Sequence, residues 1–171
     1  MPNPVIDVEG NRVWQNWHSS RGVGGAVERF YTPHNAWDDG STTPGKAFQP
    51  GLVALQQIVQ EAEKNGKRVR ALGSGWSLNS VAFVADYVVN TSRLSSWFLG
   101  FRTPAYVEAA ERPNSGQLVF TQCGTQIKTL NTYLESNRLA LPTSGASNGQ
   151  TIVGAMSTGT HGAAIGVGAI Q

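Results

Sequence analysis

The chain has 171 residues, of which 40% are hydrophobic and only 14% charged, against about 25% charged in a typical soluble domain. This length supports one domain with a hydrophobic core, and the low charge indicates that a ligand, a partner chain or another domain covers much of its surface. The net charge is +2 and the one basic cluster, formed by Lys64, Lys67, Arg68 and Arg70, is small, so nucleic-acid binding is not expected.

Neither a signal peptide nor a membrane span is expected from the sequence. The N-terminus, MPNPVIDVEGN, holds two prolines and two acids and lacks an apolar run. Residues 154–170 are uncharged, but their glycines and hydroxyl groups make a poor membrane helix. The single cysteine, Cys123, excludes an internal disulfide. We therefore expect a soluble protein, with the cytoplasm as the favoured compartment.

Residues 1–46 are expected to wrap around the domain rather than to build it. Trp14 and Trp17 are typical of a hydrophobic lid over a core. Residues 21–45 are rich in Gly, Pro, Asn and Asp, which predicts a long irregular connection on the surface. The domain proper is expected to span residues 47–171.

A first α/β lobe is expected at residues 47–95. Pro50 suits the first turn of a helix and Gly66 suits its end. Between them an apolar face recurs at helical spacing, formed by Leu52, Leu55, Ile58, Val59 and Ala62. Residues 68–72 and 87–90 predict two short strands connected through a glycine loop.

A second α/β lobe is expected at residues 105–171. It begins with two predicted strands, at residues 106–110 and 117–122. Residues 113–116, with the sequence PNSG, predict a hairpin turn between them. The fold class is therefore expected to be α+β, with two small α/β lobes.

An amphipathic helix and a further strand are expected next in the second lobe. The helix has Thr125 as its expected N-cap, Asn137 at its end, and an apolar face formed by Ile127, Leu130 and Leu134. Residues 139–141 predict a strand, which Pro142 stops because proline cannot donate to a strand ladder.

The glycine loop after residues 68–72 is a candidate anion site. In Gly73-Ser74-Gly75-Trp76-Ser77 the glycines allow positive φ and close approach, so successive backbone N–H groups can converge on one point. A loop without Lys or Arg suits a pyrophosphate held by backbone dipoles better than a transferring γ-phosphate, which requires a P-loop lysine and Mg²⁺. A tight turn between two strands is an equally good interpretation. The third glycine and the following helix of a Rossmann fingerprint are absent.

A second motif, Gly145-Ala146-Ser147-Asn148-Gly149, matches the G-x-S-x-G nucleophile elbow of α/β-hydrolases. That mechanism needs an acid and a histidine after the serine in the chain. No Asp or Glu follows Glu135, so the triad cannot be completed. A Ser147 hydrolase is therefore a disfavoured alternative.

Residues 152–162 predict a short helix that breaks into a glycine turn. Gly154 permits close packing on a ligand or a strand, and hydrogen bonds can be made by the hydroxyl groups of Ser157, Thr158 and Thr160. His161 is either a ligand contact or, in the interpretation that the chemistry favours, a structural turn residue.

Three segments occur in an order and at a spacing shared with a known family. They are residues 14–17 (WQNW), residues 70–77 (RALGSGWS) and residues 151–162 (TIVGAMSTGTHG). They resemble the opening motif, the pyrophosphate loop (usually G-x-G-H-S) and a second FAD loop (commonly ending in G-T-H-G) of the vanillyl-alcohol oxidase family. Within the family the sugar-lactone and alditol oxidases are most similar. The resemblance covers nearly the whole chain, as the N-terminal portion of the FAD-binding domain.

The resemblance implies FAD as the cofactor, with the two lobes sandwiching its pyrophosphate. It implies pyrophosphate contacts from the first loop through Ala71, Leu72, Gly73, Ser74, Gly75, Trp76 and Ser77, with Asn79 beside them. It implies that the ribityl and flavin side is lined by Thr151, Gly154, Ser157, Gly159, Thr160, His161 and Gly162. The implied reaction is oxidation of a C–OH group of an alcohol, sugar or lactone by hydride transfer to the flavin, which oxygen or another acceptor reoxidises.

The chain departs from the family pattern at Trp76, where many relatives carry the histidine that bonds covalently to the flavin. An indole carbon cannot serve as the imidazole nitrogen does, so FAD is expected to be non-covalent at this position. Cys123 does not stand where doubly attached relatives carry a cysteine, and we expect it to be a buried free thiol.

The resemblance also bears on what surrounds the chain. Relatives continue past the second loop into the rest of the FAD domain and a substrate domain that carries the catalytic residues. The catalytic residues are therefore expected on a second polypeptide, which acts with this chain on a small-molecule alcohol. A non-catalytic flavin- or nucleotide-binding module is the open alternative.

Overall fold

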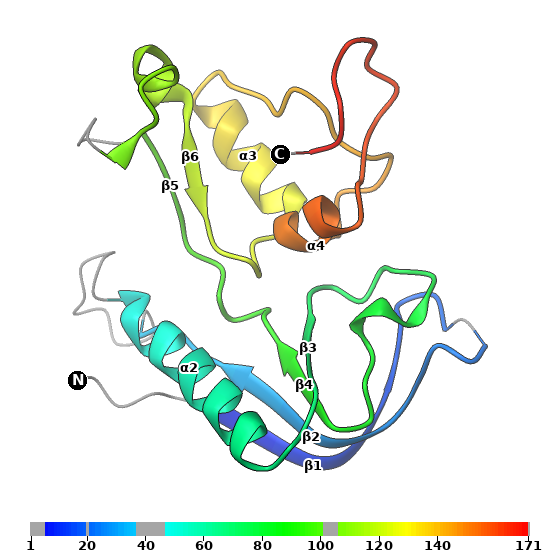
Figure 1. Ribbon diagram of the computed structural model, residues 1–171. Coiled ribbons are helices and arrows are strands. Elements are labelled where there is room, and N and C mark those ends of the chain that lie inside the picture. The colour runs from blue at the N-terminus through cyan, green and yellow to red at the C-terminus, as the bar shows by residue number, and fades with distance from the viewer. Residues whose placement is uncertain (1–5, 20, 37–46, 101–105, 171) are drawn as a thin grey trace.

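The computed structural model describes residues 6–19, 21–36, 47–100 and 106–170, which form two lobes (Figure 1). The first lobe holds a four-stranded sheet made of β1 (Ile6–Gln15), β2 (Gly24–Pro33), β4 (Tyr87–Asn90) and β3 (Val69–Leu72), with the helix α2 (Gln49–Lys64). The second lobe holds β5 (Trp97–Leu99), β6 (Val119–Thr121), α3 (Ile127–Ser136) and α4 (Ile152–Ser157). The predicted α+β class is confirmed.

The sheet of the first lobe is mixed. β1 pairs antiparallel with β2, whereas β2 and β3 both run parallel to β4, with Phe30 and Arg70 opposite Val88. Parallel neighbours need a crossover connection, and between β3 and β4 it consists of the glycine loop and a short 3₁₀ helix, η2 (Ser80–Ala82). The carboxyl ends of β3 and β4 therefore lie at the same edge, where the glycine loop begins.

The expected irregular connection at residues 21–45 is wrong for residues 24–33, which form the inner strand β2. The Gly24-Gly25 start and the Pro33 end are turn-like in composition, but the residues between them include Val27 and Phe30, which are buried. Burial between β1 and β4 outweighs the weak local signal, because strand preference depends mainly on packing against neighbours. Residues 37–46 lie outside the described residues.

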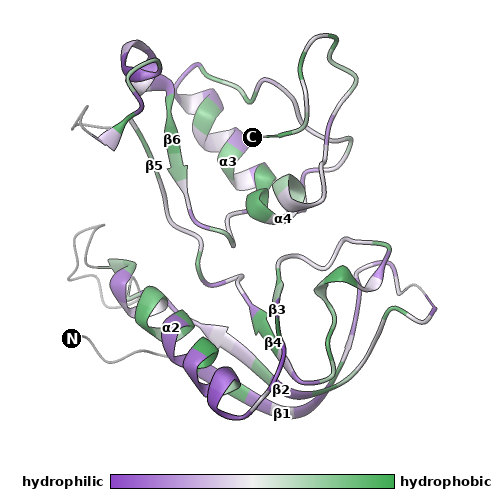
Figure 2. Ribbon diagram, in the orientation of Figure 1, coloured by the Kyte–Doolittle hydropathy of each residue, from purple (hydrophilic) through white to green (hydrophobic). Residues whose placement is uncertain are grey.

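The helix α2 is confirmed, and Gly66 follows its end with a positive φ of 61°. Ile58 and Ala62 pack on one face of the sheet, and Figure 2 shows hydrophobic and hydrophilic residues in turn along α2. Two predicted face residues, Leu52 and Val59, are instead 40% and 56% exposed. The buried stripe is therefore rotated toward one side of the predicted face; it consists of Pro50, Gly51, Ala54, Ile58 and Ala62. None of the helices in the described ranges is long and apolar enough to cross a membrane.

The second lobe packs α3 against α4. The predicted apolar face of α3 is confirmed: Ile127, Leu130 and Leu134 are buried against Ile152 and Ala155 of α4. Each such side chain, fully buried, stabilises the fold by about 1.5–3 kcal/mol. The helix ends at Asn137 as expected. Its N-cap is Gln126 and not the expected Thr125, which lies one residue earlier.

The predicted hairpin at residues 106–122 is wrong in its first half. Residues 106–110 form no strand, and a 3₁₀ helix, η4 (Arg112–Gln117), replaces the turn. Proline in the first turn of η4 favours the helical start. The strand that pairs with β6 is β5, with Phe98 opposite Phe120, and the rings of these two residues stack with centroids 4.8 Å apart.

The predicted strand at residues 139–141 is also absent. Arg138 has a positive φ of 59° and turns the chain back on α3, so that the Leu139 N–H donates to the Leu134 carbonyl. Leu139 and Leu141 pack against the core of the second lobe without a partner strand. The apolar residues at these positions therefore reflect packing in the core and not membership of a strand.

A network of side-chain amides joins the two lobes where the chain crosses from β4 to β5. The Asn35 amide donates to Gln122 Oε1 at 2.7 Å and to Ser96 Oγ at 3.0 Å. The Ser96 N–H donates to the same Gln122 oxygen at 2.9 Å. Asn35 follows β2 in the first lobe and Gln122 follows β6 in the second, so this network fixes one lobe against the other.

We expect the Asn35→Ala substitution to destabilise the protein by about 1–3 kcal/mol, because it removes the hydrogen bonds of a nearly buried amide. Urea denaturation measures this change. Asn114→Ala is the matched control, since the Asn114 amide is exposed on η4, and it should shift stability by less than about 0.5 kcal/mol. Equal denaturation midpoints for the two variants would contradict a role for the network.

Candidate cofactor-binding cleft

Two cavities lie between the lobes and meet at the glycine loop. The first has a volume of about 260 Å³ and the second about 700 Å³. Both draw residues from each lobe, and both are lined by Gly73, Ser74, Trp76 and Thr151. The two cavities therefore form one cleft with a shared middle.

The glycine loop presents its backbone to this cleft. It leaves β3 at Leu72, and Gly75 has a positive φ of 70°, a conformation that favours glycine. The Gly75 carbonyl accepts a hydrogen bond from the Trp17 N–H at 2.8 Å, and the Ser77 carbonyl accepts one from the Asn16 side chain at 2.9 Å. Within the part of the chain that the structure describes, no acceptor takes the backbone N–H groups of residues 73–77. They form a row of donors available to a ligand.

The opposite wall begins at Thr151. The Ile127 N–H donates to the Gln150 carbonyl at 2.9 Å and the Ile152 N–H to the Thr125 carbonyl at 2.8 Å, and these bonds tie residues 150–152 to the start of α3. α4 follows at once, and the chain turns at Gly159, whose φ is 66°. This wall is therefore held by backbone hydrogen bonds on both sides of Thr151.

The two walls approach so closely that only glycine fits at the contact. A Cβ added to Gly73 would lie 2.1 Å from Thr151 Oγ1, well inside van der Waals contact. A Cβ added to Gly149 would lie 2.6 Å from the Trp76 ring. The absent side chains therefore allow the lobes to touch beside the cavities.

Trp76 is held by aromatic contacts. Its ring stacks on Trp17 with centroids 5.5 Å apart and an interplanar angle of 5°, and His18 meets it edge-on at 5.7 Å. Trp17 is itself 67% exposed. The opening motif thus supports the glycine loop through this stack and through its hydrogen bonds, and Trp17 itself lines the second cavity.

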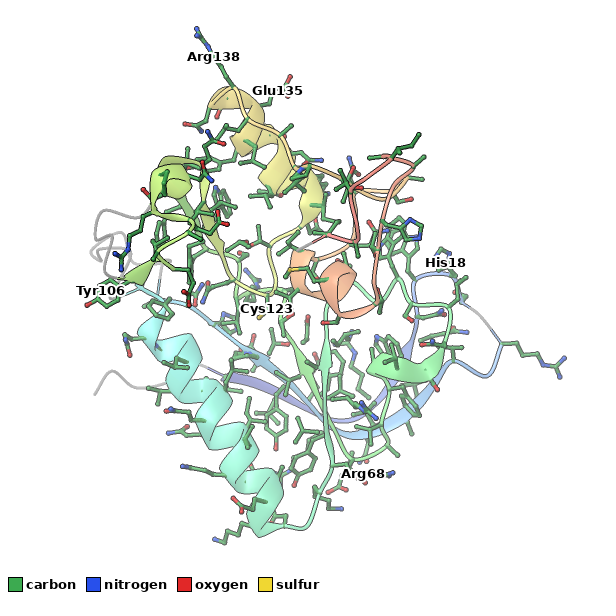
Figure 3. All side chains as sticks on the ribbon, turned by 45° about the horizontal axis from the view of Figure 1, so that its top comes forward. His18, Arg68, Tyr106, Cys123, Glu135 and Arg138 are labelled. Atoms are coloured by element: carbon green, nitrogen blue, oxygen red, sulfur yellow. The ribbon has the colours of Figure 1, made fainter. Side chains whose placement is uncertain are left out.

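The first cavity has no charged side chain among its described lining residues. Cys123 is one of them and lies between the lobes beside α4 (Figure 3). It is a free, partly buried thiol, and burial raises its pKa, so it stays protonated at neutral pH. Gln150 also lines this cavity, and its side-chain Oε1 is buried without a hydrogen-bond partner in the described structure. A buried acceptor of this kind is costly unless a ligand or water donates to it.

The structure brings ten of the predicted cofactor residues to the cleft, namely Ala71, Gly73, Ser74, Gly75, Trp76, Ser77, Thr151, Gly154, Ser157 and Thr160. Their contact with FAD stays a prediction. Five others do not line the cavities: Leu72, Asn79, Gly159, His161 and Gly162.

These five residues have structural contacts instead. Leu72 is buried in the core of the first lobe, and the Asn79 side chain caps η2. Gly159 supplies a turn, the Gly162 N–H donates to Thr143 Oγ1 at 3.0 Å, and His161 Nδ1 lies 3.0 Å from the Gly162 carbonyl.

Several residues that line the cleft were not predicted from the sequence. They include Thr91, Cys123, Gln126, Lys128, Gln150 and Val153. Ser147 also lines the second cavity, but no histidine and no acidic residue does so among the described residues of either cavity. Thus nothing in the cleft supports a Ser147 hydrolase. Gln150 had a local signal, because it directly precedes Thr151.

The chain is similar in sequence to known lactone oxidases and dehydrogenases. The D-arabinono-1,4-lactone oxidase of Candida albicans is 31% identical over 124 residues, which are 70% of this chain and 22% of the relative. The L-gulono-1,4-lactone dehydrogenase of Mycobacterium tuberculosis is 30% identical over 123 residues, 71% of this chain and 26% of the relative. The chain thus spans about a quarter or less of the length of these relatives.

A solved structure shares the fold. A cholesterol oxidase from B. sterolicum superposes with a TM-score of 0.62 at 17% identity, over 96% of this chain and 28% of that one. A family model described as FAD binding domain matches residues 53–169, which include both walls of the cleft. The chain therefore belongs to the FAD binding domain family.

Proposed function

We propose that this chain is the cofactor-holding part of a flavin-dependent oxidoreductase, with FAD in the cleft between its lobes. The observation that carries the proposal is the row of backbone N–H groups at residues 73–77, which have no acceptor in the described structure. Such a row suits a diphosphate. Family membership agrees with this assignment.

The remaining residues of the cleft also fit FAD. Gly73 and Gly149 lack the side chains that would close the contact between the lobes. The unpartnered Gln150 Oε1 can accept a hydrogen bond from an N–H or O–H group of the cofactor. Oxidation of a C–OH group would draw on the hydride-accepting ring of bound FAD, and the chain's own residues bind that cofactor and orient it.

The substrate class is inferred from the relatives. Two of them are named as a lactone oxidase and a lactone dehydrogenase, so we propose a C–OH donor among alcohols, sugars and sugar lactones. No carboxylate or imidazole is found among the described residues that line the cavities. The acid–base groups of the reaction are therefore proposed to lie on further polypeptide that acts with this chain.

The first expected result concerns reversible binding of FAD. Added FAD should bind and should slow the alkylation of Cys123 by iodoacetamide, because this thiol lines the first cavity. Denaturing the complex should release all the flavin, since the indole of Trp76 offers no site for the covalent bond. Flavin fluorescence in the supernatant measures the release. Flavin that stays with the precipitated chain would contradict non-covalent binding, and unchanged alkylation would contradict the location.

The Gly73→Ala substitution should weaken FAD binding by about five- to 150-fold. The new Cβ would overlap Thr151 Oγ1, and a strained contact of this kind costs about 1–3 kcal/mol. Equilibrium titration with FAD measures the affinity. Gly116→Ala is the control, because its added Cβ meets no described atom within 4 Å, and it should bind FAD normally. Equal affinities for both variants would rule out the close contact as a requirement.

The third expected result concerns catalysis. The FAD-loaded 171-residue chain alone should keep its visible flavin absorption when L-gulono-1,4-lactone is added without oxygen, because no carboxylate or imidazole is found among the described residues that line the cavities. The complete enzyme, isolated with the further polypeptide proposed above, should be tested against a panel of lactones and alcohols. At least one of these compounds should abolish the visible flavin absorption. Bleaching by the chain alone would place the catalytic groups within it. An intact enzyme that no compound bleaches would favour the non-catalytic binding module.

A further inference from the structure

Backbone N–H groups alone can hold a diphosphate, and a cation beside them strengthens the binding. The FAD diphosphate carries two negative charges, and residues 73–77 contain no basic side chain. Backbone dipoles supply only partial charges. If the proposed function holds, a basic side chain that borders the same cavity would add to this binding.

One charged side chain belongs to a residue that lines the cleft in the described structure, and that residue is Lys128. It lines the second cavity together with Gly73 and Ser74 of the glycine loop. The lysine comes from the second lobe and the loop from the first. Lys128 and three residues of the loop, Gly73, Ser74 and Trp76, therefore line the same cavity from opposite lobes.

Backbone hydrogen bonds hold the main chain at Lys128, an exposed residue. It is the second residue of α3, and its N–H donates to the Asn148 carbonyl at 2.8 Å. The preceding Ile127 N–H donates to the Gln150 carbonyl. Because the first N–H groups of α3 are already bonded, the end of this helix is not itself a free anion site. The lysine side chain is the source of positive charge at this wall.

Lys128 also has no acidic partner in the described residues. By contrast, four basic residues of the first lobe form ion pairs, which are Arg12–Glu9, Arg29–Glu61, Lys67–Glu28 and Arg68–Asp86. The acidic Glu135 lies toward the far end of α3, away from the cleft (Figure 3). The ammonium group of Lys128 is therefore available to a ligand.

We propose that Lys128 is the counter-charge of the FAD diphosphate and connects the second lobe to a group held by the loop of the first. An ammonium group pairs with phosphate through charge-assisted hydrogen bonds, which are stronger than neutral ones. Bound FAD thus joins the two lobes through its phosphates. This role rests on the proposed function and makes Lys128 a cofactor-binding residue that the glycine motifs do not include.

The test compares Lys128→Gln with Lys128→Arg, using Lys64→Gln on the exposed end of α2 as the control. Dissociation constants are measured by titration for FAD, for ADP, which keeps the diphosphate, and for riboflavin, which has none. Lys128→Gln should weaken FAD and ADP about tenfold, the loss expected for one charge-assisted hydrogen bond, and leave riboflavin unchanged. Lys128→Arg should keep most of the affinity, and Lys64→Gln all of it.

Salt dependence supplies a second readout. The affinity of the wild-type chain for FAD should fall as salt rises, and the fall should be shallower for Lys128→Gln, because one screened charge contact is gone. This measurement needs FAD alone, so it decides the matter if ADP or riboflavin binds too weakly to measure.

The outcomes separate the two proposals. A wild-type chain that does not bind FAD would overturn the proposed function and this inference with it. A wild-type chain that binds FAD, with unchanged affinity and salt dependence in Lys128→Gln, would overturn the lysine's role alone. A loss of equal size for riboflavin would also overturn it, because the effect would then not follow the diphosphate.

Discussion

The close approach of Gly73 and Thr151 is the contact on which the rest of the cleft depends. It brings a loop of the first lobe against the N-terminal end of α4 in the second, with no space for a Cβ between them. The amide network of Asn35 and Gln122 holds the lobes together at the crossing of the chain. The backbone N–H groups of the loop can face a ligand only while both contacts keep this arrangement.

Elements with a strong local signal could be predicted from the sequence. The helix α2 has helical spacing between Pro50 and Gly66, and α3 repeats its apolar residues in the same way. Both glycine-rich walls of the cleft could be recognised in the sequence. Glycine adopts backbone conformations that other residues avoid and permits close approach, so a dense run of glycines indicates a binding loop. Each of these signals comes from residues that are close together in the chain, so it can be recognised from the sequence alone.

Elements that depend on distant partners were missed or misplaced. β2 begins with two glycines, and only its position between β1 and β4 makes it a strand. β5 pairs with β6 across 20 residues, so its partner could not be read from local turns. Lys128 and Gln150 reach the cleft because α3 and α4 pack together. The local sequence of Lys128 does not show that it faces the other lobe, and Gln150 is marked only by its position directly before Thr151.

Each lobe is built from a continuous stretch of chain, with the crossing near Ser96 between them (Figure 1). During synthesis the sheet of the first lobe can therefore form before α3 and α4 have left the ribosome, as domains fold in order from the N-terminus. At that stage the glycine loop has no opposite wall, because that wall is complete only when Thr160 has left the ribosome. A cofactor that contacts both walls can therefore do so only after nearly all of these residues have been synthesised.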